Sequence, residues 1–254
     1  MKEPGSAKRA ESFLLYAVSL PLCFIAALRG LGWIVRKILP DLSDVWIRVL
    51  VELPVAALVF LIFKNIIRKG EKRPLSLHHF LFSLCITGLP CWILAAYNLF
   101  SGPLQSGFGN ILGAAAGAFA VGLCEELVFR GAAFNGLRTL WPEEKKAALR
   151  AALISSCVFG LIHLFSPEPT WGETLLQVVF AFSAGVYLCG VFIFAGTLLI
   201  PVLLHSILNA CAFLLLSDGS TAAVWVQGGA SALFLILGLA LLSTGIPKDS
   251  GSSR

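Results

Sequence analysis

The sequence predicts an all-α fold, a polytopic membrane bundle of about eight transmembrane helices. Of its 254 residues 57% are hydrophobic and only 13% are charged, whereas soluble domains carry about 25% charged residues. The apolar residues also form runs close to the roughly 20 residues that a helix needs to cross a hydrocarbon core of about 30 Å. None of these runs alternates as a barrel strand would, and a helix satisfies its own backbone hydrogen bonds in lipid.

Eight apolar runs account for the predicted helices. The first lacks a clear small-residue cleavage site and is followed by further runs, so we interpret it as a retained helix rather than a signal peptide. The second and fifth are short, which leaves their ends less sharply defined. In order, the runs are residues 13–35, 49–63, 80–100, 111–129, 151–165, 175–194, 198–216 and 222–242.

The basic residues predict the orientation in the membrane. The net charge is +5, and most Lys and Arg residues lie before the first run, after the second and after the fourth, which is one side of the membrane. The positive-inside rule then places both termini in the cytoplasm, in the cell (inner) membrane; Arg36, Lys37 and Arg48 lie on the opposite side. Juxtamembrane Lys and Arg are the ordinary topology signal, so we expect the lipid bilayer as a partner and no nucleic acid.

The fourth run ends in ionisable residues, which are costly inside a membrane and are usually paired or functional. Small residues in ILGAAAGAFAVG (111–122) allow close helix packing and predict that this helix lies in the bundle interior. The next residues are CEELVFRG (124–131). Glu126 and Arg130 are four apart, the spacing that lets them pair on one helix face. Glu125 is rotated by about 100° from Glu126, so we expect it to remain without that partner and to be free for acid–base chemistry.

Polar residues also occur in the fifth and seventh runs. His163 ends the sequence FGLIH one turn after Phe159, and HSILN places His205 and Asn209 on one helix face. One intramembrane His is more often a hydrogen-bonded core residue than a catalyst. Two of them, with an Asn and a carboxylate in the same half of the chain, favour a catalytic site.

The seven cysteines predict neither a disulfide framework nor a zinc knuckle. All lie within or beside apolar runs, and none forms a CxxC pair, so we interpret them as small hydrophobic residues. Cys124 stands beside the two carboxylates and is a conceivable nucleophile, although apolar surroundings blunt a thiol.

Together these residues resemble the CAAX protease and bacteriocin-processing family of intramembrane proteases, also called CPBP or Abi, and its type II CAAX prenyl endopeptidases. EELVFR is similar to the family's EExxxR motif, FGLIH to FxxxH and HSILN to HxxxN, in the same order, over residues from about 111 to 213. The resemblance implies an eight-helix bundle with a water-accessible cavity. It divides the chain into N-terminal helices and basic linkers (1–100), a catalytic membrane domain (101–246) and a polar tail (247–254).

The resemblance also implies roles for individual residues in an intramembrane endopeptidase. Glu125 would activate the attacking water with help from His163, and His205 and Asn209 would face the developing oxyanion. Glu126 and Arg130 would brace the site, with Phe159 in support. The substrate would be a membrane-anchored protein or peptide, processed at a CAAX-type or another C-terminal or sorting signal.

Alternatives stay open at this point. We favour catalysis without a cofactor, but Glu125, His163 and His205 could bind zinc, with Glu126 as the base; the chain has no HExxH sequence of an ordinary zincin. A non-catalytic scaffold or immunity protein is a second alternative, and an ion-coupled transporter a third. The transporter is disfavoured because no repeated half is visible.

Overall fold

The computed structural model describes residues 6–71, 76–101, 104, 107–141, 146–165, 169–214 and 221–244. Regular secondary structure in these ranges is entirely helical. Seven helices there are long and apolar enough to cross a membrane, and one further apolar helix, Leu199–Leu214, is shorter. The predicted all-α membrane bundle of about eight helices is therefore confirmed. The polar tail predicted for 247–254 lies outside the described residues.

Three of the membrane helices consist of consecutive segments with different helical geometry. The first begins as α1 and passes through a π-helical segment, and the fourth does the same shortly after the paired glutamates. The fifth ends in a 3₁₀ turn. The segments are α1 (Ser6–Phe13), η1 (Leu14–Ser19) and α2 (Leu20–Ile38); α5 (Phe108–Glu126), η2 (Leu127–Phe134) and α6 (Asn135–Arg138); and α7 (Ala147–Leu161) with η3 (Ile162–Phe165).

The other five helices are continuous. They are α3 (Asp44–Gly70), α4 (Leu77–Phe100), α8 (Trp171–Ala195), α9 (Leu199–Leu214) and α10 (Thr221–Thr244). Each of the eight predicted apolar runs overlaps one membrane helix. The largest difference is α3, which extends beyond the run 49–63 at both ends, because charged residues at its two termini continue the helix after the apolar pattern has stopped.

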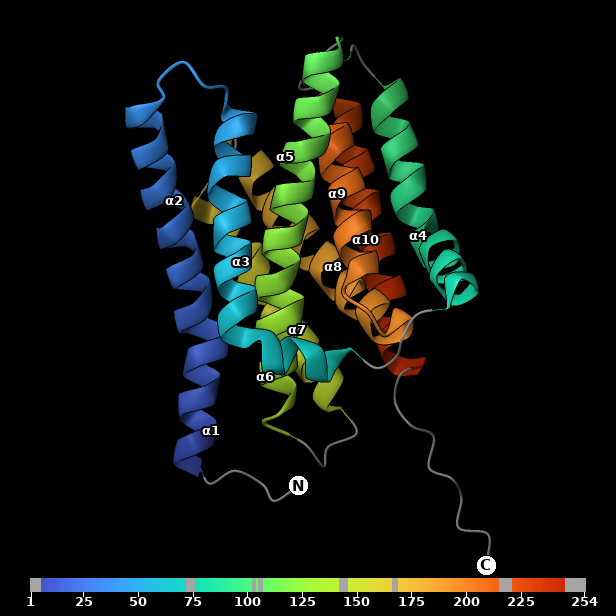
Figure 1. The fold of residues 1–254 in the computed structure, drawn as a ribbon. Coiled ribbons are helices and arrows are strands. Elements are labelled where there is room, and N and C mark those ends of the chain that lie inside the picture. The colour runs from blue at the N-terminus through green and yellow to red at the C-terminus, as the bar shows by residue number, and fades with distance from the viewer. Residues whose placement is uncertain are drawn as a thin grey trace, which may run out of the picture.

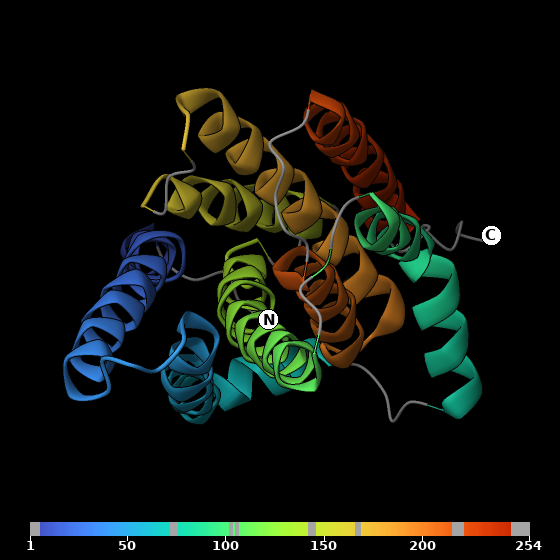
Figure 2. The ribbon, with the colours of Figure 1, turned by 90° about the horizontal axis from the view of Figure 1, so that it is seen from above.

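Helices α5 and α9 lie near the centre of the bundle and are surrounded by the others, as Figure 2 shows from above. Helix α5 packs against α3 on one side and α9 on the other, and α4 covers α9. Helix α8 packs against α7 and α10. The expectation that the fourth membrane helix lies in the interior is confirmed, since about three fifths (61%) of its most apolar stretch is buried.

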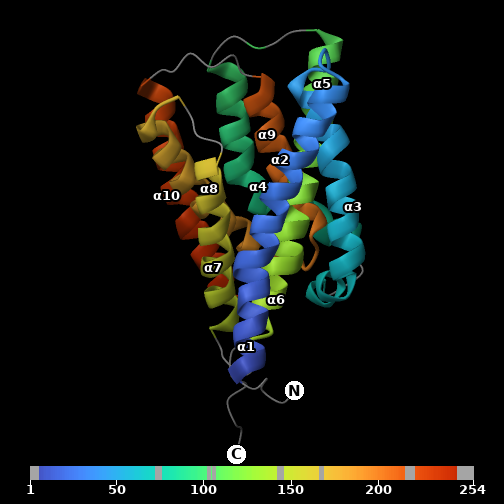
Figure 3. The same cartoon turned by 90° about the vertical axis from the view of Figure 1, so that its left-hand side faces the viewer.

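Successive membrane helices run in opposite directions, so α1 begins and α10 ends at the same end of the bundle (Figures 1 and 3). The basic ends of α3 and α6 lie at that end too, whereas Arg36 and Lys37 close α2 at the other. The grouping of charges seen in the sequence is thus matched by the fold. The cytoplasmic placement of this end stays a prediction.

Glycines allow the closest helix contacts, and the tightest of them against backbone atoms lies between α8 and α10. A Cβ atom built on Gly238 of α10 would lie 2.6 Å from the backbone nitrogen of Tyr187 and 2.8 Å from the carbonyl carbon of Val186. Backbone atoms cannot rotate away as a side chain can. Only glycine therefore permits this contact, in the way that small residues let membrane helices approach.

We predict that Gly238→Ala destabilises the bundle by about 1–3 kcal/mol, the usual range for overpacking, because α10 must move away from α8. Thermal unfolding of the purified protein in detergent measures this. Gly228→Ala on the same helix is the matched control, since a Cβ there meets nothing within 4 Å. Equal unfolding temperatures for the two variants would contradict the packing argument.

Candidate active site

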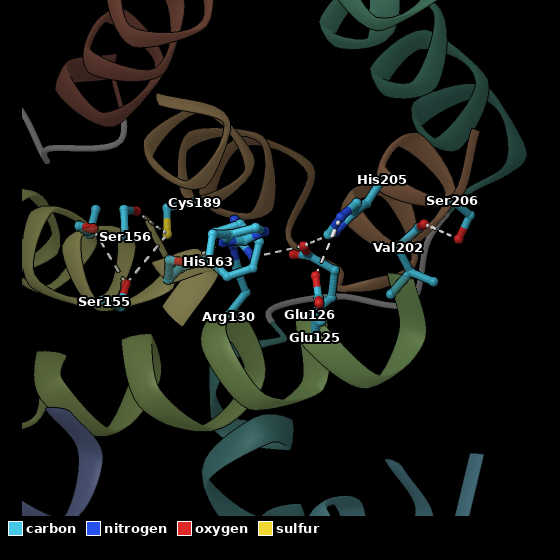
Figure 4. A network of polar contacts seen from close by, with 12 residues as sticks. Glu125, Glu126, Arg130, Ser155, Ser156, His163, Cys189, Val202, His205 and Ser206 are labelled. Atoms are coloured by element: carbon cyan, nitrogen blue, oxygen red, sulfur yellow. Dashed lines mark hydrogen bonds and ion pairs between the residues drawn. The ribbon is translucent and has the colours of Figure 1, made fainter. Parts of the chain in front are cut away.

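The centre of the site is the carboxylate of Glu126, the last residue of α5. Its side chain is fully buried, and its Oε1 accepts hydrogen bonds from Arg130 Nη1 and from His205 Nδ1, each at 2.8 Å. Figure 4 shows this carboxylate between the guanidinium and the imidazole. The predicted pairing of Glu126 with Arg130 is confirmed, and the same oxygen also joins α5 to α9.

Glu125 approaches the same imidazole from the other side. Its Oε2 lies 3.5 Å from His205 Nε2, and its side chain keeps 17% of its surface exposed, whereas Glu126 keeps none. The two adjacent glutamates therefore differ as the helix geometry predicts. Glu126 is held by Arg130, and Glu125 makes a looser contact and remains accessible.

The hydrogen bonds fix where His205 carries its proton. Glu126 is the ion-pair partner of Arg130, so its carboxylate accepts, and His205 Nδ1 must donate. The second ring nitrogen, Nε2, then faces Glu125. It is the nitrogen available for exchange with reacting atoms.

Phe159 brings His163 into the same cluster. Its ring meets the His163 ring edge-to-face at 5.2 Å and the His205 ring at 6.1 Å, and the Arg130 guanidinium lies 4.6 Å from its centroid. A desolvated cation over an aromatic face is favourable by about 2 kcal/mol. Phe159 thus contacts both imidazoles and the guanidinium, and it links α7 to the charged residues.

His163 itself bonds to its own helix rather than to a glutamate. Its Nδ1 lies 2.9 Å from the Phe159 carbonyl oxygen, and because a carbonyl can only accept, Nδ1 carries the proton. In the neutral ring Nε2 then has a free lone pair and can accept a proton from water. No hydrogen bond between His163 and Glu125 is found among the described residues, so their cooperation stays a prediction.

Asn209 follows His205 by one turn of α9 and is partly buried. Within the described ranges no hydrogen bond joins its carboxamide to the glutamates or histidines. Its shared helix face with His205 is compatible with the oxyanion role that the sequence suggested, which remains untested.

Close packing of α5 on α9 holds the two halves of the site together. A Cβ atom on Gly122, one turn before Glu126, would lie 3.1 Å from the Ser206 backbone nitrogen and 3.2 Å from the Val202 carbonyl oxygen. Ser206 in turn donates to the Val202 carbonyl at 2.7 Å. Gly122 therefore sets the helix separation at which His205 reaches both glutamates.

Two features near the site were missed in the sequence analysis. The eight residues of η2, which include Arg130, are π-helical and all buried; π-helical segments are frequent at functional sites, but no sequence pattern announces them. Glu52 of α3 is also buried, with 5% of its surface exposed. The sequence does indicate this residue, because Glu52 is a charged residue inside the predicted apolar run 49–63.

The candidate zinc ligands do not form a ligand set in this structure. Among the described residues no group of three His, Cys, Asp or Glu side chains is placed to hold a metal ion. The Nδ1 atoms of His163 and His205 are engaged by Phe159 and Glu126, which leaves the Nε2 atom of each ring as the one that could bind a metal. The zinc alternative therefore stays a prediction, and we derive no step through a metal.

The thiol of Cys124 is likewise poorly placed for chemistry. Its side chain is completely buried in the main hydrophobic core. A nucleophile must reach its substrate, so this position favours the interpretation of Cys124 as a small hydrophobic residue.

Comparison with known protein families gives one match, over part of the chain. Residues 107–211 match the family model described as type II CAAX prenyl endopeptidase, Rce1-like. The match contains all three motifs and confirms the family resemblance expected from them. No curated protein and no solved structure matches the chain.

We predict that Arg130→Met destabilises the protein by about 3–5 kcal/mol, because it leaves the buried Glu126 carboxylate without its cation. Glu126→Gln combined with Arg130→Met should recover much of this loss, which a double-mutant cycle of unfolding free energies measures. Arg36→Met is the control, since the ion pair of Arg36 with Asp44 is exposed and should contribute no more than about 1 kcal/mol. Equal effects at the two arginines would contradict the assigned role of the buried pair.

Proposed function

We propose that this protein is an intramembrane endopeptidase that hydrolyses a peptide bond of a membrane-associated protein by means of a glutamate-activated water. The Rce1-like match suggests CAAX-type protease activity, and the apolar helices make the protein an integral membrane protein. The observation that supports the mechanism is the contrast between neighbouring acids: Glu126 is buried and paired, while Glu125 is partly exposed beside His205 Nε2.

Glu125 is the proposed base. Amide hydrolysis requires an acceptor for a proton of the attacking water, and a positioned base contributes about 10²–10⁴-fold to the rate. His163 assists through Nε2, the ring nitrogen that its bond to the Phe159 carbonyl leaves free. The proton taken from water then passes to the nitrogen of the leaving peptide.

His205 and Asn209 are the proposed donors to the oxyanion. When the carbonyl carbon becomes tetrahedral, negative charge develops on its oxygen, and each fixed donor aimed at that oxygen lowers the barrier by about 3–4 kcal/mol. The Nδ1 proton of His205 is already donated to Glu126, which Arg130 holds in turn. His205 therefore donates to the oxyanion from Nε2, as the doubly protonated imidazolium. Glu126 and Arg130 thus act by positioning rather than by touching the substrate.

The proposed substrate is a membrane-anchored protein or peptide. The site lies among membrane helices: its residues stand at the C-terminal ends of α5 and α7 and on α9. A substrate already in the bilayer therefore reaches it most directly. A CAAX-type C-terminus is the leading candidate because of the family match. Processing of another C-terminal or sorting signal would use the same chemistry.

We predict that Glu125→Gln lowers kcat/KM by about 10²–10⁴-fold and leaves folding and membrane insertion intact, because the amide fills the same volume but cannot accept the proton. The measurement compares peptides released from membranes containing the wild type or the variant, followed by kinetics on the peptides found. Glu11→Gln on the exposed part of α1 is the control. Retained cleavage by the Glu125 variant would reject the assignment.

We also predict that activity survives a strong chelator and that the purified protein carries no stoichiometric zinc, since the mechanism uses carboxylate, imidazole and carboxamide groups alone. Elemental analysis and kinetics with and without chelator measure both. Loss of activity on chelation, with recovery on adding zinc, would instead support a zinc enzyme.

A further inference from the structure

Glu52 of α3 belongs to no motif, yet its carboxyl group is buried inside the bundle. Its side chain is 6% exposed, and its Oε1 lies 3.7 Å from Arg48 Nη1, which is too long for a hydrogen bond. Its Oε2 is buried, and no hydrogen-bond partner is found for it in the described part of the chain. A buried polar atom of this kind calls for an explanation, because nearly all such atoms in proteins are satisfied.

The packing of α3 on α5 places Glu52 at the level of the proposed base. These two helices run in parallel: Val45 meets positions 113 and 117 near their beginnings, and Ile67 meets position 131 further on. Seven residues are about two helical turns and return a helix to the same face. Counting two turns from the contact of Val45 with Gly117 brings Glu52 to about the level of Cys124 and its neighbour Glu125.

The electrostatic couplings agree with this register. Glu52 lies close enough to Glu125 and to Cys124, across the α3–α5 contact, for their charges to influence one another. Glu125 is thus approached from two sides, by His205 of α9 and by Glu52 of α3. The second carboxyl group comes from the half of the chain in which no family motif occurs.

The ion pair with Arg48 is a weak structural reason for this glutamate, since its closest approach is 3.7 Å. Its nearest cation, Arg48, is about half exposed (52%) and lies over the Phe213 ring, so Arg48 can remain solvated without it. Replacing a poorly paired buried charge by an apolar residue of similar size is often neutral or stabilising. A buried carboxyl group of this kind lowers the stability of the fold, as groups at functional sites commonly do.

We propose that Glu52 is a further residue of the hydrolytic site, whose free carboxyl oxygen holds the attacking water against Glu125. This inference rests on the proposed function. A water placed between the two carboxyl groups donates one O–H to Glu52 and the other to Glu125, so its lone pair is left free for the peptide carbonyl. Glu125 takes the proton when the new bond to carbon forms, and Glu52 only orients.

The first test needs no substrate. A crystal or cryo-electron-microscopy structure at a resolution that shows waters should have one within about 3 Å of both Glu52 Oε2 and a Glu125 carboxyl oxygen. Glu52→Met should remove it and raise the unfolding temperature by about 2 °C or more. Leu58→Met at an exposed site on the same helix is the control. A protein group bonded to Glu52 Oε2, or a lower unfolding temperature for Glu52→Met, would overturn the proposal.

The second test is kinetic and uses a quenched fluorescent peptide ending in a prenylated CAAX sequence. Glu52→Met should lower kcat about 10- to 100-fold through misplacement of the water, with KM nearly unchanged. Glu52→Gln should recover most of kcat, since its carboxamide oxygen still accepts. Wild-type kcat in Glu52→Met with an inactive Glu125→Gln would overturn this inference alone. Wild-type activity in both variants would overturn the proposed function. The first test, a water bonded to both carboxyl groups, would then show separately whether Glu52 lies against Glu125.

Discussion

The structure of the site depends on one buried oxygen atom, Glu126 Oε1, which accepts from both Arg130 and His205. An isolated carboxylate at this depth would be strongly unfavourable, as would an isolated guanidinium. Pairing the two groups, with the Phe159 ring beside the guanidinium, lowers the free-energy cost of burying them in an apolar surrounding. The pair fixes the end of α5, and through His205 it fixes the position of α9.

The helix packing around this oxygen follows from side-chain size. Gly122 lets α5 approach the backbone of α9, and Gly117 lets it approach α3 near Val45. Because α5 is enclosed on both sides, residues on neighbouring turns of it face different helices. Glu126 faces α9 and the interior, while Glu125 lies where α3 and α9 both come near. One helix can thus present two adjacent glutamates to different surroundings and give them different tasks.

These surroundings divide the polar residues into a fixed group and an accessible group. Glu126, Arg130 and the Nδ1 side of His205 are buried and mutually bonded, so they have little freedom to move. Glu125, His163 and Asn209 are only partly buried, and they are the groups to which we assign contact with water or substrate. Preorganised donors supported by a rigid inner layer are what hydrolysis requires, since they need not reorganise when charge develops.

The sequence by itself determined the membrane bundle, the order of its helices and the pairing of Glu126 with Arg130. These depend on hydrophobic run length and on spacing within one helix, which are local properties. The tertiary structure decided that His205 lies between two glutamates, that Phe159 joins both imidazoles and the guanidinium, and that the Glu52 carboxyl group of α3 is buried inside the bundle. Such contacts depend on the rotation and register of helices distant in sequence. Local periodicity does not encode these, because they are set by where glycines let backbones approach and where buried charges find partners.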